Sequence, residues 1–168
     1  MTLYNPPSAQ GSASVSPLDA HTQSGTSVAE TTYRFVSFYL DDKHYALPAR
    51  AVAEVTGHIT PTPLPDGPEP LSGIAPHRGD ILAIVNPGVP ARSGDPSKRK
   101  AVVLRPIGDK VELPIAFNVD RIGEMLQIRA ADLRHSSTDD PLGEFEASVN
   151  GQPVLVVDPS RIADLLSL

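Results

Sequence analysis

Residues 73–85 read GIAPHRGDILAIV, with an arginine and a glycine at a bend between two apolar stretches. Gly79 permits the positive φ that a tight turn between strands often needs. The stretch from Ile81 to Val85 is short, apolar and rich in branched side chains, which is typical of a strand that enters a core. The sequence therefore predicts a bend that leaves Arg78 at the rim, where it can meet a partner.

The composition favours many short elements joined by turns. The chain has 168 residues, of which 18 are proline, 12 are glycine and only 5% are aromatic. A chain of this length suits one small domain, or two minimal barrels that share a core. Because prolines and glycines interrupt long helices, we expect an all-β fold.

Charge and cysteine content exclude several classes of protein. The formal net charge is -6, whereas general nucleic-acid binders usually carry an excess of basic residues. The chain has no cysteine, so it has neither disulfides nor a thiolate metal site, and the cytoplasm is the simplest expectation. Since no apolar run approaches the ~18 residues that span a bilayer, we expect any membrane association to be indirect.

The pattern along the chain predicts a tail followed by two groups of strands. Residues 1–32 contain few large apolar side chains, so we expect a disordered tail. A polar loop over 87–100 then suggests a first barrel over roughly 33–90 and a second over roughly 100–158. Besides the strand at 81–85, strands are expected at 33–40, 44–47, 101–104, 111–119, 122–128, 145–149 and 154–157.

Turn and cap residues refine this outline. Asn150-Gly151 is a dipeptide that readily takes positive φ and predicts a hairpin. Asp158 followed by Pro159 is typical of a helix start, so we expect a closing helix over 159–167. Residues 49–55 could form one helical turn or an irregular strand, and the five prolines in 61–70 predict an extended connector.

The sequence offers little for catalysis or cofactor binding. The five histidines are scattered without the spacing of a metal site, and no phosphate loop or nucleophile elbow is present. We therefore expect no metal, no cofactor and no enzyme. A small hydrolase that uses His77 with Asp80 or Asp120 is the distant alternative. The acidic residues near the C-terminus are expected to form a solvated surface; they are Asp139, Asp140, Glu144 and Glu146.

Several different short motifs follow one another along the chain. They are Phe35-Val36-Ser37-Phe38, Tyr45-Ala46-Leu47-Pro48, Val52-Ala53-Glu54-Val55, Gly73-Ile74, Arg78-Gly79, Ile84-Val85, Val119-Asp120-Arg121-Ile122-Gly123-Glu124-Met125 and Leu155-Val156-Val157-Asp158. In order and separation they resemble the CheW-like coupling proteins of bacterial chemosensory systems. The resemblance covers about residues 33–168.

The resemblance implies two small SH3-like, five-stranded β-barrels packed around a shared apolar interior. It implies a non-catalytic cytoplasmic adaptor that links the tips of methyl-accepting chemoreceptors, in arrays at the inner membrane, to the regulatory domain of a CheA-type histidine kinase. The matching positions on the kinase side are Val52, Glu54 and Val55. On the receptor side they are Arg78, Gly79, Ala101, Ala116 and Ile122.

Other roles stay open for some of these residues. Val52 could instead pack in the core, and Arg78 could be a solvated turn charge. The chain also departs from the family pattern, with Pro76-His77 in place of Asn-Leu before Arg-Gly and Asn86-Pro87 in place of Asp-Leu. These departures suggest a second possibility, a scaffold of the same fold that self-associates or serves a pathway other than chemotaxis.

Overall fold

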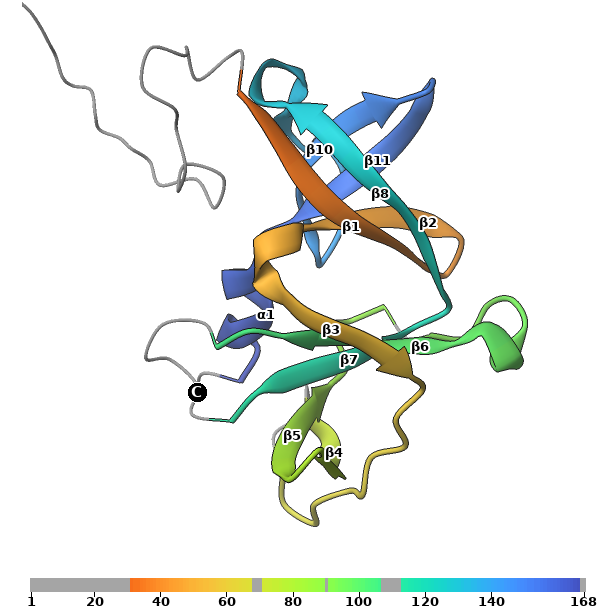
Figure 1. Ribbon diagram of the computed structural model, residues 1–168, viewed down its shortest axis with the longest axis vertical. Coiled ribbons are helices and arrows are strands. Elements are labelled where there is room, and N and C mark those ends of the chain that lie inside the picture. The colour runs from red at the N-terminus through yellow and green to blue at the C-terminus, as the bar shows by residue number, and fades with distance from the viewer. Residues whose placement is uncertain (1–30, 68–70, 90, 107–112, 167–168) are drawn as a thin grey trace, which may run out of the picture.

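The computed structural model describes residues 31–67, 71–89, 91–106 and 113–166. These residues form two β-sheets, one above the other in Figure 1, with a short helix, α1, at one side between them. The mostly-β expectation is confirmed. The predicted tail lies outside the described residues apart from its last two positions, and the first strand begins at Thr32.

The first sheet has six strands in the order β8-β1-β2-β11-β10-β9. All pairs are antiparallel except the parallel pair of β2 with β11. The strands are β1 Thr32–Leu40, β2 Lys43–Pro48, β8 Arg121–Arg129, β9 Arg134–His135, β10 Gly143–Val149 and β11 Gln152–Val157.

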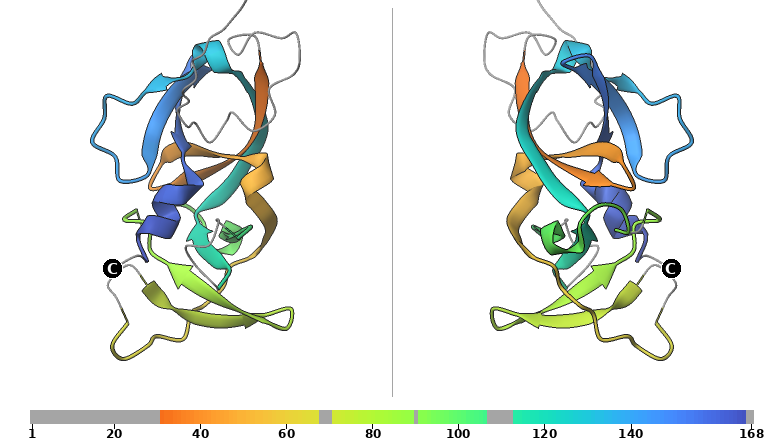
Figure 2. Two further views of the ribbon diagram at one scale, coloured as in Figure 1. Left: turned by 90° about the vertical axis from the view of Figure 1, so that its left-hand side faces the viewer. Right: turned by 90° about the vertical axis from the view of Figure 1, so that its right-hand side faces the viewer.

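The second sheet has five strands in the order β3-β6-β7-β5-β4. The β4–β5 hairpin projects away from the six-stranded sheet in both views of Figure 2. The strands are β3 Val52–Gly57, β4 Leu71–His77, β5 Asp80–Val85, β6 Lys100–Leu104 and β7 Ile115–Val119. Residues 111–112, where the last of these was expected to begin, lie outside the described residues.

The sheets divide the chain differently from the expected split at residues 87–100. The hairpin of β1 and β2 pairs with β8 and β11, so the first sheet joins the two ends of the described chain. The polar loop only connects β5 to β6 within the second sheet. The physical reason is core formation: Phe35 of β1 and Ile128 of β8 belong to one buried cluster.

Three apolar clusters form the core, and one of them joins the two sheets. One lies within the six-stranded sheet around Phe35 and Val156, and one within the five-stranded sheet around Leu82. The largest joins both sheets and includes Ile162 of α1. There the ring of Phe38 stacks on Tyr45 and meets the edge of Phe117 from the other sheet, at centroid distances of 5.6 and 5.4 Å. The expected shared apolar interior is therefore present.

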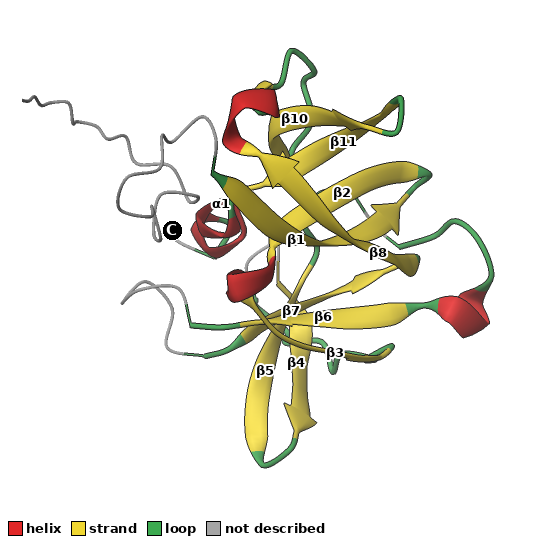
Figure 3. Ribbon diagram, turned by 45° about the horizontal axis from the view of Figure 1, so that its top comes forward, coloured by secondary structure: helices red, strands yellow, loops and turns green. Residues whose placement is uncertain are grey.

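Local turn and cap chemistry behaves as the sequence predicts. Asn150 and Gly151 have φ values of 52° and 78°, which suits a two-residue hairpin turn. Asp158 accepts a hydrogen bond from the Ser160 amide at 2.9 Å and caps α1, Pro159–Asp164. Residues 49–55 were expected to form either a helical turn or an irregular strand, and they form one after the other: a 3₁₀ helix over Ala49–Ala51 and then β3. The short helical elements stand out in Figure 3.

Neither sheet closes through a continuous backbone ladder within the described ranges, so the expected five-stranded barrels are open sheets of six and five strands. Residues 58–62, which we call the strap, run from the end of β3 to β4. Thr62 exchanges two backbone hydrogen bonds with Ile74, at 2.8 and 3.0 Å. The side-chain amide of Asn118 on β7 binds the strap. It donates to the Ile59 carbonyl at 2.8 Å and accepts from the Ile59 backbone amide at 3.0 Å.

The strap depends on a glycine in β4. Gly73 has a φ of 152°, and a Cβ there would overlap the Thr62 carbonyl oxygen. We expect Gly73→Ala to lower the free energy of unfolding by about 1–3 kcal/mol, because the strap must move or the strand must distort. Urea denaturation measures this change. Gly57→Ala is the matched control, since its Cβ would meet no atom within 4 Å, and equal stability of the two variants would contradict the prediction.

Candidate partner-binding site

The turn between β4 and β5 carries Arg78 at the tip of a hairpin. His77 pairs with Asp80 across the hairpin, which leaves Arg78 and Gly79 as a two-residue loop with φ values of 51° and 86°. The predicted positive φ at Gly79 is confirmed, and Arg78 shares the left-handed conformation. The side chain of Arg78 is 72% exposed. The turn therefore presents this guanidinium at the rim, as the sequence predicts.

Glu54 on β3 binds both residues at this turn. One carboxylate oxygen lies 3.1 Å from His77 Nε2, and the other lies 3.1 Å from Arg78 Nε. Arg78 Nε also lies 3.3 Å from His77 Nε2. We call Glu54, His77 and Arg78 the Glu54 cluster. The hydrogen bond with His77 and the positive charge of Arg78 lower the pKa of Glu54 below its usual value, so the carboxylate is ionised at neutral pH.

The Glu54 cluster joins the two edges of the five-stranded sheet. β3 and β4 are the outermost strands in the hydrogen-bonded order, yet their side chains meet because the sheet curls. A bulge between Val52 and Glu54 changes the register of β3 at this point. Residues expected to serve two different partners therefore touch each other, and His77 supplies a third contact that the sequence did not predict.

The other expected kinase-side residues differ in their exposure. Val55 is 39% exposed and can contact a partner. Val52 is 8% exposed and belongs to the core shared by the two sheets. The structure thus favours the core-packing role for Val52, because its side chain lies beneath the strand surface.

Only part of the expected receptor side is exposed. Arg78 and Gly79 lie at the surface, whereas Ala101 and Ala116 are 1% and 0% exposed. These alanines sit on β6 and β7, which have apolar clusters on both faces, so their side chains cannot reach a partner. Ile122 on β8 is half-buried and packs against the shared core.

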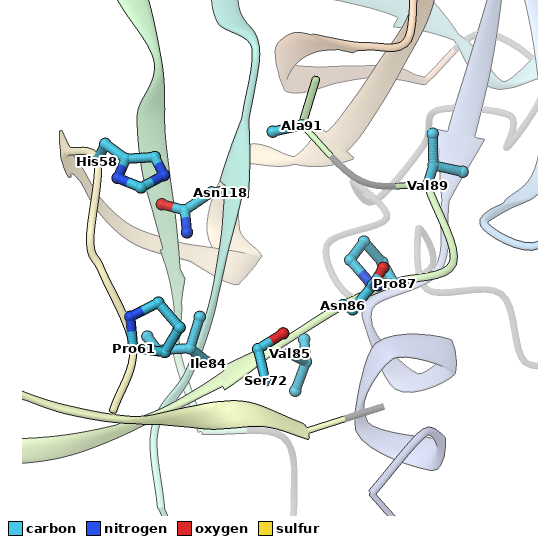
Figure 4. A pocket seen from close by; sticks show the side chains of 10 residues that line it. All are labelled: His58, Pro61, Ser72, Ile84, Val85, Asn86, Pro87, Val89, Ala91 and Asn118. Carbon is cyan, nitrogen blue, oxygen red and sulfur yellow. The ribbon is translucent and has the colours of Figure 1, made fainter. Parts of the chain in front are cut away.

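A pocket of about 150 Å³ opens beside the strap (Figure 4). Asn86 and Pro87, which follow β5, are among the residues that line it. The side chain of Asn86 accepts a hydrogen bond from the Gly88 amide at 2.9 Å, which shapes the loop after β5. His58, Ser72 and Asn118 add polar groups to the lining. Sequence reasoning found no signal for this pocket, because its lining comes from the strap, from β5 and from β7, which are far apart in the sequence.

A buried carboxylate lies elsewhere, in the loop between β9 and β10 of the six-stranded sheet. Asp140 was expected on a solvated acidic surface, but its side chain is only 1% exposed. It accepts hydrogen bonds from the Tyr45 hydroxyl at 2.8 Å, from the amides of Leu142 and Gly143 at 2.9 Å each, and from Lys43 Nζ at 3.1 Å. These four hydrogen bonds fix the buried carboxylate within the fold, which indicates a structural role for Asp140.

The structure gives no support to hydrolytic chemistry at the turn. His77 pairs with Glu54 and Arg78, while Asp120 accepts from the Asp41 amide at 2.8 Å and faces Arg99 at 3.8 Å. Within the described part of the chain, no group of three His, Cys, Asp or Glu side chains could hold a metal ion. Across the same residues, no helix has the length and apolar character to cross a membrane.

Comparisons with known proteins agree on one family. A family model described as a CheW-like domain matches residues 34–167. The chemotaxis protein CheW of Rhizobium meliloti (strain 1021) is 24% identical over 115 residues, which cover 67% of this chain and 71% of that protein. The crystal structure of the scaffolding protein TtCheW from Thermoanaerobacter tengcongensis matches with a TM-score of 0.63 and 20% identity. That match covers 76% of this chain and 90% of the other, and it shows a common fold.

Proposed function

Because the chain belongs to the CheW-like family, we propose that it is a non-catalytic adaptor of bacterial chemosensory signalling. It couples the cytoplasmic tips of methyl-accepting chemoreceptors to the regulatory domain of a CheA-type histidine kinase. It acts in the cytoplasm and reaches the membrane only through receptor arrays. The family match over residues 34–167 carries this proposal, and the partly exposed Glu54 cluster supplies a surface that a partner can contact.

The kinase side is proposed to centre on β3. Val55 offers an exposed apolar side chain, and Glu54 next to it offers a negative charge that fixes orientation. A small apolar anchor beside one charge is a common composition of binding hot spots, where truncation costs about 2 kcal/mol or more. Val52 does not contact the partner in this proposal; its side chain packs in the core and holds β3 in place.

The receptor side is proposed to centre on the Arg78–Gly79 turn. A guanidinium at this rim can donate charge-assisted hydrogen bonds to carboxylates or to carbonyl groups at a helix end. Gly79 has no side chain and leaves room for close approach of a partner's backbone. Ala101 and Ala116 take no direct part, since both are buried.

Capture of a cognate kinase regulatory domain by the purified protein tests this proposal. We expect Val55→Asp to weaken capture by about 30-fold, because it places a charge at an apolar anchor. Its circular dichroism should match the wild type, since Val55 is exposed. Met125→Asp is the matched control on the other sheet, where Met125 is 57% exposed, and it should bind normally.

The same experiment separates the alternatives. Absence of capture by the wild-type protein would contradict the adaptor proposal. Capture of a second copy of this chain without any kinase would instead favour the self-associating scaffold, and light scattering would show oligomers that grow with concentration. Equal capture by Val55→Asp and the wild type would remove β3 from the binding surface.

A further inference from the structure

One ring nitrogen of His77 faces both a hydrogen-bond acceptor and a hydrogen-bond donor. Its Nε2 lies 3.1 Å from the Glu54 carboxylate, an acceptor, and 3.3 Å from Arg78 Nε, a donor. An imidazole nitrogen either carries a hydrogen and donates or has a lone pair and accepts. The two contacts therefore cannot both be hydrogen bonds of Nε2 in one protonation state.

We propose that His77 is a proton-dependent switch that decides whether Glu54 holds Arg78. With a lone pair on Nε2, His77 accepts from Arg78 Nε, whose hydrogen also faces the Glu54 carboxylate, and the guanidinium is held. With His77 protonated on both ring nitrogens, Nε2 donates its one hydrogen to Glu54, so it no longer accepts from Arg78, and the imidazolium repels the guanidinium. Arg78 then leaves the carboxylate and points into solvent.

The burial of the two cations decides which of them leaves. The side chain of His77 is 19% exposed and that of Arg78 is 72% exposed. Removing the imidazolium from Glu54 would leave a mostly buried charge without its partner, which is costly. Releasing Arg78 costs little, because an exposed ion pair contributes only about 0–1 kcal/mol. Protonation of His77 therefore displaces Arg78 rather than His77.

Charged groups of both signs face His77. Glu54 faces it from β3, Asp80 lies opposite it in the hairpin, and Arg78 lies beside it on the turn. The hairpin beneath is apolar, with Ala75 and Leu82 buried in the same cluster. Histidine is the side chain that ordinarily changes charge between about pH 5 and pH 8.

The functional meaning of the switch rests on the proposed function. If Arg78 binds the receptor tip, a fall in cytoplasmic pH frees the guanidinium for carboxylates of that partner while Glu54 becomes paired with His77.

Nuclear magnetic resonance of the free protein tests the switch. We expect the Arg78 Nε–Hε signal to lose its hydrogen-bonded shift between about pH 8 and pH 5.5 and to approach that of an exposed arginine such as Arg50. The midpoint should equal that of the His77 ring signals. In His77→Leu the Arg78 signal should stay constant over this range. His135→Leu, on β9, is the matched control and should leave the Arg78 response intact.

Two outcomes would overturn the switch. One is an Arg78 signal that stays constant while His77 titrates, and the other is an unchanged Arg78 response in His77→Leu. Capture of the receptor tip at about pH 8 and pH 6, measured in parallel, tests the proposed function separately. A response of Arg78 without capture at either pH would support the switch and contradict the adaptor, and capture without that response would do the reverse.

Discussion

Replacement of Asp140 by alanine is expected to lower the free energy of unfolding by about 3–5 kcal/mol. The carboxylate accepts four hydrogen bonds in the six-stranded sheet, from Tyr45, Leu142, Gly143 and Lys43. Without it, a buried hydroxyl and two buried amides lose their acceptor, and each such group costs about 1–3 kcal/mol when left unsatisfied. Urea denaturation at neutral pH measures the loss.

The pH dependence of stability gives a second test of Asp140. Burial acts to raise its pKa, but the hydrogen bonds from Gly143, Leu142, Tyr45 and Lys43 outweigh burial and hold the pKa below its usual value. A carboxyl whose pKa is lower in the folded state stabilises the protein above its unfolded pKa. That contribution disappears as the pH falls through the lower, folded pKa. Asp140→Ala should lack this acid-dependent part of the stability curve.

Asp139→Ala is the matched control, since the neighbouring aspartate is exposed. It should change the free energy of unfolding by no more than ~0.5 kcal/mol. Asp140→Asn should fall between the two, because an amide keeps one acceptor oxygen but loses the charge. Equal stability of Asp140→Ala and Asp139→Ala would contradict the structural role of this carboxylate.

Glu54→Lys is expected to reduce capture of the kinase regulatory domain by at least about 30-fold. The substitution removes the proposed orienting charge and places a cation beside His77 and the guanidinium of Arg78. Because Glu54 is partly exposed at the rim, circular dichroism should stay unchanged. Glu124→Lys, an exposed position on β8, is the matched control and should bind normally.

A charge exchange separates two roles of Glu54. Glu54→Lys with Arg78→Glu restores an ion pair within the chain but reverses its direction. If the carboxylate binds the kinase directly, capture stays lost in the double variant, which is the result we expect. Recovery of capture would contradict that role and assign Glu54 to holding the turn.

Features decided by neighbouring residues could be predicted from the sequence. The Arg78–Gly79 bend, the Asn150–Gly151 hairpin and the Asp158 cap all depend on φ preferences or on bonds two residues apart. The pattern of apolar side chains along the sequence predicted where most strands lie. The resemblance to the family added the pairing of two sheets around a shared core, which no single segment reveals.

Features decided by the curl and order of the sheets could not be predicted. Glu54 and Arg78 meet because opposite edges of one sheet approach, and nothing local to either residue indicates this contact. Asp140 follows Asp139 in a polar stretch that is typical of a solvated loop, yet Tyr45 from a distant strand buries it. The burial of Ala101 and Ala116 likewise follows from packing on both faces of their sheet.

The late strands β8 and β11 pair with the early strands β1 and β2, and this affects the order in which the protein can fold. The five-stranded sheet uses the continuous stretch Val52–Val119, apart from residues outside the described ranges, and all its strands are available once that stretch has been synthesised. The hairpin of β1 and β2 is made first but has its neighbours only when β8 and β11 leave the ribosome. Until then Phe35, which is fully buried in the folded protein, lacks most of its cluster, since Ile128 and Val156 come later in the chain. The β1–β2 hairpin is thus among the last parts of the two sheets to be completed, and a newly synthesised chain is most exposed to misassembly there.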